Sequence, residues 1–131
     1  MNRSGYSDDC DNNWDLIKWR GQVASSIRGK RGQAFLHELL VALDAMPDKR
    51  LITDELQSEA GVCALGCVGA RRGLVMTDLD PEDSGQIAWM LGIANPLVCE
   101  IEWVNDEAAL EPETPEQRWQ RVRRWVVDQL R

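Results

Sequence analysis

The strongest structural signal in the sequence is an amphipathic helix between residues 32 and 45. Its apolar residues recur at positions i, i+1, i+4, i+5 and i+8, which places them on one face of an α-helix. Pro47 follows the segment and stops it, because proline lacks a backbone donor and clashes with the preceding turn. The apolar face consists of Phe35, Leu36, Leu39, Leu40 and Leu43. The pattern predicts a helical core.

Boundary residues predict further helices on both sides of this one. A first helix is expected to begin near Asn13, capped by Asn12 or Asn13, and Gly29–Gly32 are expected to break the chain after it. Three later starts combine a capping residue with proline, which is well tolerated in the first helical turn. They are Asp80-Pro81, Asn95-Pro96 and Thr114-Pro115, the last with a capping box to Gln117.

The predicted fold class is mainly α, a compact bundle of five or six helices. A short extended piece is expected near residues 49–53. Residues 61–70 are rich in small residues and suit either a closely packed helix or a buried strand, of which we favour the helix. Residues 1–12 are polar and are expected to form a flexible lead-in. Residues 13–131 are then a single helical domain, in keeping with the size of the chain.

The residue inventory argues against several functional classes. No apolar stretch approaches the roughly 20 residues that cross a bilayer, and no signal-peptide core is visible, so a cytoplasmic location without a membrane partner is expected. The thiols Cys10, Cys63, Cys67 and Cys99 are then expected to be free. His37 is the single histidine, so neither a metal site nor a nucleophile triad is predicted. We therefore expect a protein that is not an enzyme and carries no cofactor.

Charge is segregated along the chain, whose net charge is −7. Residues 16–37 hold five basic residues and no acid, whereas residues 78–116 hold eleven acids and no lysine or arginine. One interpretation is that the two blocks pair with each other inside the fold. The other is that the acidic block forms a surface for a host protein with a basic groove. That predicted acidic face comprises Asp78, Asp80, Glu82, Asp83, Glu100, Glu102, Trp103, Asp106 and Glu107.

The basic block supplies an alternative function, a small regulator that contacts nucleic acid. Arginine and lysine neutralise phosphates, and tryptophan stacks on bases. The residues that would make these contacts are Lys18, Trp19, Arg20, Arg28, Lys30 and Arg31.

Residues 84–104 resemble a helix-turn-helix pattern. Ala88 and Gly92 are small where two helices would cross, and Val98 and Ile101 would anchor the second helix in the core. That helix is expected to expose Glu100 and Glu102, which would repel phosphates. We therefore favour a structural hairpin over a DNA-reading one.

Several strings in the chain resemble a group of small uncharacterised proteins encoded by bacteriophages and prophages. The resemblance rests on residues 14–21, 27–36, 105–107 and 114–119. It implies a phage accessory protein acting inside a bacterial cell, and by analogy an inhibitor of a host nucleic-acid-handling or defence complex, such as an anti-CRISPR protein that binds a CRISPR effector. A third hypothesis is a phage structural component or homodimer that assembles through a tryptophan-bearing surface, since the chain has six tryptophans.

Overall fold

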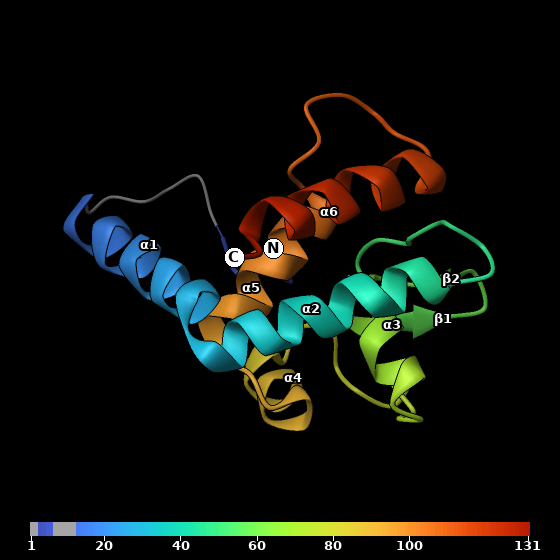
Figure 1. The fold of residues 1–131 in the computed structure, drawn as a ribbon, viewed down its shortest axis with the longest axis horizontal. Helices are drawn as coiled ribbons and strands as arrows, with labels where there is room; N and C mark the ends of the chain where they lie inside the picture. Colours follow the sequence, from blue (N-terminus) through green and yellow to red (C-terminus); the bar gives the residue numbers. More distant parts are fainter. Residues whose placement is uncertain (1–2, 7–12) are drawn as a thin grey trace.

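The computed structural model describes residues 3–6 and 13–131 and contains six helices and one short hairpin in these residues. The prediction of a mainly helical bundle with a short extended piece is confirmed (Figure 1). The helices are α1 (Asn13–Arg28), α2 (Lys30–Ala45), α3 (Ala64–Arg71), α4 (Ser84–Leu91), α5 (Asn95–Asp106) and α6 (Pro115–Gln129). The hairpin pairs β1 (Gln57–Ser58) with β2 (Gly61–Val62) in antiparallel register.

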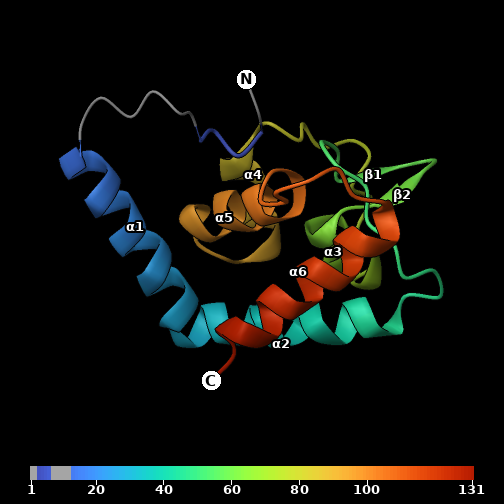
Figure 2. The same cartoon turned by 90° about the horizontal axis from the view of Figure 1, so that it is seen from above.

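Helix α5 lies at the centre of the arrangement. It contacts α1, α3, α4 and α6, while α2 packs across α1, α3 and α6 (Figure 2). Eight residues of α5 are buried from solvent, and three of these are polar or charged. The apolar face predicted for α2 is in the core: Phe35, Leu36, Leu39 and Leu43 are buried and Leu40 packs against them.

Helices α1 and α2 meet at an elbow at Gly29, as the glycine pattern predicted, and α1 runs away from the body as an arm (Figure 2). α2 begins at Lys30, two residues earlier than expected. Gly32 is required just inside it, because a Cβ there would lie 1.7 Å from the Ser26 carbonyl oxygen. The Gln33 amide donates to the carbonyls of Ile27 and Gln129 and so ties the elbow to the end of α6.

Most of the small-residue segment forms helix α3, as favoured from the sequence, but its first two residues, Gly61 and Val62, form strand β2. Cys63 caps the helix, its Sγ accepting a hydrogen bond from the Gly66 amide. At Gly66 the helix passes so close to the loop before β1 that a Cβ would lie 1.8 Å from the Leu56 carbonyl oxygen. Glycine is the residue that allows this approach, because it has no side chain.

The extended piece lies a few residues later than predicted. Residues 49–53 form no strand; the strands are at 57–58 and 61–62, and the Ile52 amide donates to the Val62 carbonyl beside them. Helix α4 likewise starts at Ser84, three residues after the predicted proline start. Asp80 and Pro81 form a turn instead, in which the Asp83 amide donates to the Asp80 carbonyl, and Asp83 is the cap. The Thr114-Pro115 start is confirmed with its capping box, and α5 does begin at Asn95-Pro96, but its N-cap is Ala94 and Asn95 is the first helical residue.

Part of the predicted flexible lead-in is packed. Arg3 and Ser4 are buried and contact α5 and the residue that follows it. The remaining lead-in residues, 1–2 and 7–12, lie outside the described residues. Within the described ranges, no single helix is long and apolar enough to cross a bilayer, and α4 and α5 satisfy that test only jointly, as a pair bent by 108°.

The close approach at Gly66 predicts a sharp sensitivity to one methyl group. Gly66→Ala should destabilise the protein by about 2–4 kcal/mol, because the clash is with backbone and forces α3 away from its loop. Gly85→Ala is the matched control: it is also in a helix, its Cβ would meet Asp83 at an ordinary 3.7 Å, and it should be neutral or stabilising by about 0.5–1 kcal/mol. Urea unfolding of both variants checks this; equal stabilities would contradict the packing described.

Candidate functional site

Helices α4 and α5 do form the hairpin that the helix-turn-helix pattern predicted. Gly92 ends α4 in the left-handed conformation, with φ +73°. The direction of the chain changes by 108° between α4 and α5. The second helix, however, is the buried centre of the bundle. A recognition helix must offer a solvent-facing side to the major groove, and α5 has none of the required exposure. In this structure α5 is thus not presented to solvent as a recognition helix would be.

The expectation that α5 exposes Glu100 and Glu102 is wrong, because α5 is covered by the segments that carry basic residues. Glu100 is 4% exposed; it accepts hydrogen bonds from the Arg20 guanidinium at 2.9 and 3.1 Å and from the Tyr6 hydroxyl at 2.9 Å. The Tyr6 ring packs against Trp19 and Trp103, with centroids 5.9 and 6.2 Å away. Part of the basic block thus pairs with part of the acidic block, and three predicted contact residues, Trp19, Arg20 and Trp103, meet around Tyr6.

Arg3 makes a second buried ion cluster at the other end of α5. Its side chain is 2% exposed, and its Nε and Nη2 donate to the two carboxylate oxygens of Asp106 at 2.5 and 2.8 Å. Nη1 lies 3.5 Å from the Cys63 Sγ, and Ser4 donates to the neighbouring Glu107 at 2.8 Å. Paired, hydrogen-bonded charges of this kind are stable in an interior where single charges are not.

Glu102 lies between these clusters on α5, and within the part of the chain that the structure describes its carboxyl group lacks the hydrogen bonds that Glu100 and Asp106 have. Its side chain is completely buried, neither carboxyl oxygen has a hydrogen-bond partner among the described residues, and Arg3 Nε lies 3.6 Å from one of them. Burial raises the pKa of Glu102 to about 8, since a charged carboxylate loses its hydration there, and Asp106 adds to the effect against the attraction of Arg3.

The acids that remain at the surface do not form one continuous face. Asp78, Asp80, Glu82 and Asp83 are exposed in the loop before α4, which we call the acidic loop (residues 78–83). Glu107 begins the connection from α5 to α6, which rises above the bundle in Figure 1, whereas the chain between α3 and α4 runs below it. The predicted acidic face therefore splits into the acidic loop, a separate exposed residue at 107, and buried pairs.

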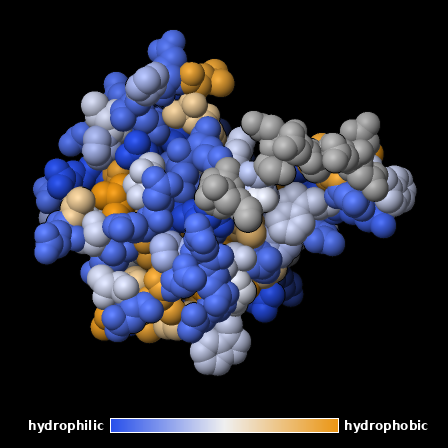
Figure 3. All heavy atoms as spheres, turned by 180° about the vertical axis from the view of Figure 1, so that it is seen from behind, coloured by the Kyte–Doolittle hydropathy of each residue, from blue (hydrophilic) through white to orange (hydrophobic). Residues whose placement is uncertain are grey.

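The helix that follows the acidic loop carries a large exposed side chain that the sequence analysis missed. Trp89 on α4 is 83% exposed. It shares a face of α4 with exposed Gly85 and Gln86, three to four residues earlier. The signal was present in the sequence as six tryptophans for one phenylalanine and one tyrosine, but nothing local distinguished Trp89 from core tryptophans. In the view of Figure 3, the other hydrophobic surface residues are scattered rather than gathered.

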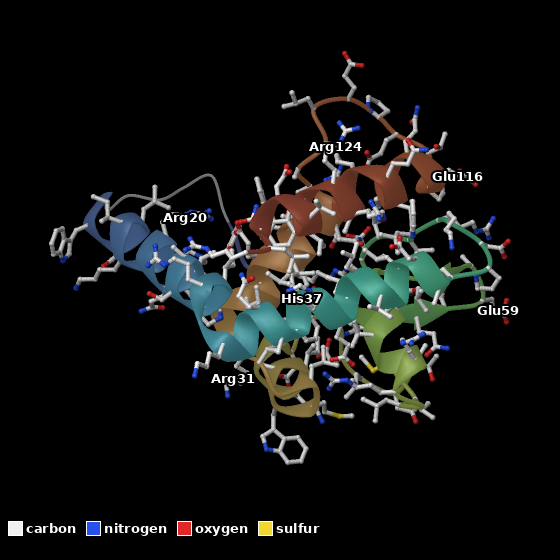
Figure 4. The ribbon with its side chains drawn as sticks, in the orientation of Figure 1. Arg20, Arg31, His37, Glu59, Glu116 and Arg124 are labelled. Atoms are coloured by element: carbon white, nitrogen blue, oxygen red, sulfur yellow. The ribbon has the colours of Figure 1, made fainter. Side chains whose placement is uncertain are left out.

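The rest of the basic block lies exposed at and before the elbow. Three exposed residues, which we call the elbow cations, lie here: Arg28, Lys30 and Arg31. They form no ion pair with any of the described residues. Lys18 stacks over the exposed Trp14 at 5.5 Å. Figure 4 shows Arg31 at the outer side of the elbow and Arg20 further along α1. The structure thus keeps the elbow cations together but assigns Arg20 to Glu100.

The histidine and the cysteines of the described residues do not gather in one cluster. His37 is exposed on α2, and no group of three or more histidine, cysteine or acidic side chains in the described residues could hold a metal ion. Cys63, Cys67 and Cys99 are buried free thiols, and burial raises the pKa of Cys67 to about 12; Cys10 lies outside the described residues. A shallow depression on α6, lined by Trp119, Arg123 and Val127 among others, holds no such cluster.

Comparison of the chain with protein-family models, with curated proteins and with solved structures gave no match.

The buried carboxyl of Glu102 predicts that stability falls as pH rises. Its folded pKa, about 8, exceeds the ordinary 4.5. The neutral carboxyl therefore contributes stability that is complete below the unfolded pKa and is lost as pH rises through the folded one. Between about pH 6 and pH 8.5 the wild type should lose about 2–3 kcal/mol of unfolding free energy. Glu102→Gln should lose much less, because an amide does not titrate. Urea unfolding at both pH values measures this; parallel losses in the two proteins would contradict the assignment.

Proposed function

We propose that this protein is a non-catalytic binding module that docks on a basic surface of another protein through the acidic loop and Trp89. The observation that carries the proposal is the contrast between two sets of acids. Glu100 and Asp106 form ion pairs with arginines of the same chain. In contrast, the four acids of the acidic loop are exposed and form no ion pair in the described residues: Asp78, Asp80, Glu82 and Asp83. Four carboxylates within six residues create a local negative potential that steers a basic partner.

Trp89 supplies what the acids alone lack. Exposed charges contribute mainly to the rate and specificity of association, while large aromatic side chains contribute most of the binding energy at protein interfaces. Helix α4 carries the tryptophan and is capped by Asp83 of the loop, so the two parts are held in a fixed relation by one short helix. The expected occupant is therefore a surface with lysines and arginines around an apolar pocket.

The resemblance to phage proteins suggests the partner class. Basic grooves are typical of machines that bind nucleic acid, and a rigid acidic protein competes for such grooves. A host defence or nucleic-acid-handling complex, with a CRISPR effector as one example, is the partner that we propose for this surface. The protein would then act as an inhibitor inside the bacterial cell.

Reversing the charge of the acidic loop should abolish partner binding without unfolding the protein. Tagged protein is used to capture partners from host lysate treated with nuclease, and the captured complex is then titrated with salt. We expect one nuclease-resistant basic protein, released by salt and lost with the triple variant Asp78→Lys, Asp80→Lys, Glu82→Lys and with Trp89→Ala. Asp83 is kept because it caps α4.

A matched variant controls for net charge. Glu55→Lys, Glu59→Lys and Glu116→Lys change the charge equally at exposed positions outside the acidic loop, two of which Figure 4 labels. This variant should bind as the wild type does. Loss of binding in the control, or binding that survives reversal of the acidic loop, would rule out the loop as the docking surface.

The elbow cations favour a second candidate, contact with nucleic acid. Arg28, Lys30 and Arg31 are exposed on one turn of chain, where three cations can neutralise phosphates. The same capture distinguishes the two functions: a nucleic-acid regulator would recover partners that disappear with nuclease and with alanine at these three positions, and would ignore changes in the acidic loop.

A further inference from the structure

Residues 3–6 lie in a slot along α5. The slot is formed by residues of α5, by Glu107 after it and by Cys63 before α3. Arg3 inserts its guanidinium between Asp106 and the Cys63 thiol, and Tyr6 reaches Glu100 one and a half turns back along α5. Figure 2 shows these first residues crossing beside α5. The partners are separated from the segment by 60 to 103 residues in sequence, so the slot is a tertiary feature of the bundle.

Residues other than Arg3 also fix the position of the Asp106 carboxylate. The Asp106 carboxylate accepts hydrogen bonds from the Asn105 side-chain amide at 2.8 Å and from the Asp54 backbone amide at 3.3 Å. Asn105 is itself fixed, because it also donates to the Ile52 carbonyl and accepts from the Ala64 amide. A carboxylate whose position is fixed in this way is preorganised for a bidentate guanidinium.

Arg3 does not satisfy all of the slot. Glu102 is fully buried at its wall; within residues 3–6 and 13–131 neither of its oxygens is hydrogen-bonded, and Arg3 Nε lies 3.6 Å away. A buried polar group without a partner costs free energy that a better-placed donor recovers. The slot therefore contains a carboxyl group, that of Glu102, to which Arg3 donates no hydrogen bond.

We propose that this slot is a binding site for an arginine side chain of another protein, and that residues 3–6 are its built-in occupant. An incoming extended segment would place its guanidinium on Asp106, donate to Glu102, and displace Arg3. A hydroxyl and an aromatic residue after the arginine would meet Glu107 and Glu100 as Ser4 and Tyr6 do. Arginine is favoured over lysine because its planar fork matches the two oxygens of Asp106.

This site uses none of the residues of the acidic loop or Trp89. Its test and that of the docking surface are therefore independent, and failure of one leaves the other standing.

The test is chemical rescue of full-length Arg3→Ala by n-propylguanidinium, which reproduces the end of an arginine side chain. At concentrations about ten times a millimolar Kd the thermal midpoint of the variant should rise by about 3–5 °C. Equal n-propylammonium should give a clearly smaller rise, and neither the wild type nor Arg28→Ala, which loses an exposed arginine, should be stabilised. A peptide with the sequence of residues 1–7 should act like propylguanidinium, and the same peptide with alanine for arginine should not.

Arg3→Lys covers the case in which the alanine variant does not fold, since lysine keeps the charge but not the fork. Propylguanidinium should raise its midpoint and leave the wild type unchanged. If the guanidinium and ammonium compounds act equally, or if the variants respond no more than the wild type does, the slot is a structural ion pair only and the proposal is overturned.

Discussion

The structure depends on the burial of acidic residues along its central helix. Helix α5 is covered on most sides, yet it carries Glu100, Glu102 and Asp106 into the interior. An isolated carboxylate in such a place is strongly unfavourable, and it is tolerated when paired, hydrogen-bonded or protonated. Each solution is present here: Arg20 and Tyr6 pair with Glu100, Arg3 pairs with Asp106, and burial raises the pKa of Glu102 to about 8.

This constraint places the ends of the chain and limits the surface chemistry. Arg20 ties α1 to Glu100 of α5, although the start of α1 extends from the body (Figure 2), and Arg3 and Ser4 are packed against the end of α5. The side chains of Glu100, Glu102 and Asp106 are buried on α5, so only the acidic loop and Glu107 remain exposed from the predicted set of acids.

Signals that act over a few residues could be predicted from the sequence. The face of α2, the break at Gly29 and the capping box at Thr114 depend on neighbours in the chain, and all three are confirmed. The helix start predicted at Asp80-Pro81 is wrong, because the same residues also suit a turn. The structure places the N-cap of α4 at Asp83.

The fate of the acids could not be predicted, because it depends on partners 80 to 103 residues away. Charge segregation indicated that internal pairing was one interpretation, but no spacing rule told which acids would pair. Arg3 in particular looked like part of a polar tail, and only the packed bundle shows the slot that it fills.

A double-mutant cycle between Arg3 and Asp106 tests most directly the claim that buried acids on α5 organise the fold. Unfolding free energies are measured for Arg3→Ala, Asp106→Ala and the double variant. If the pair is a buried, mutually dependent interaction, each single change leaves a charge unpaired, and the coupling energy should be at least about 2 kcal/mol. Effects that add to within about 0.5 kcal/mol would show that the two side chains do not depend on each other, and would contradict the account.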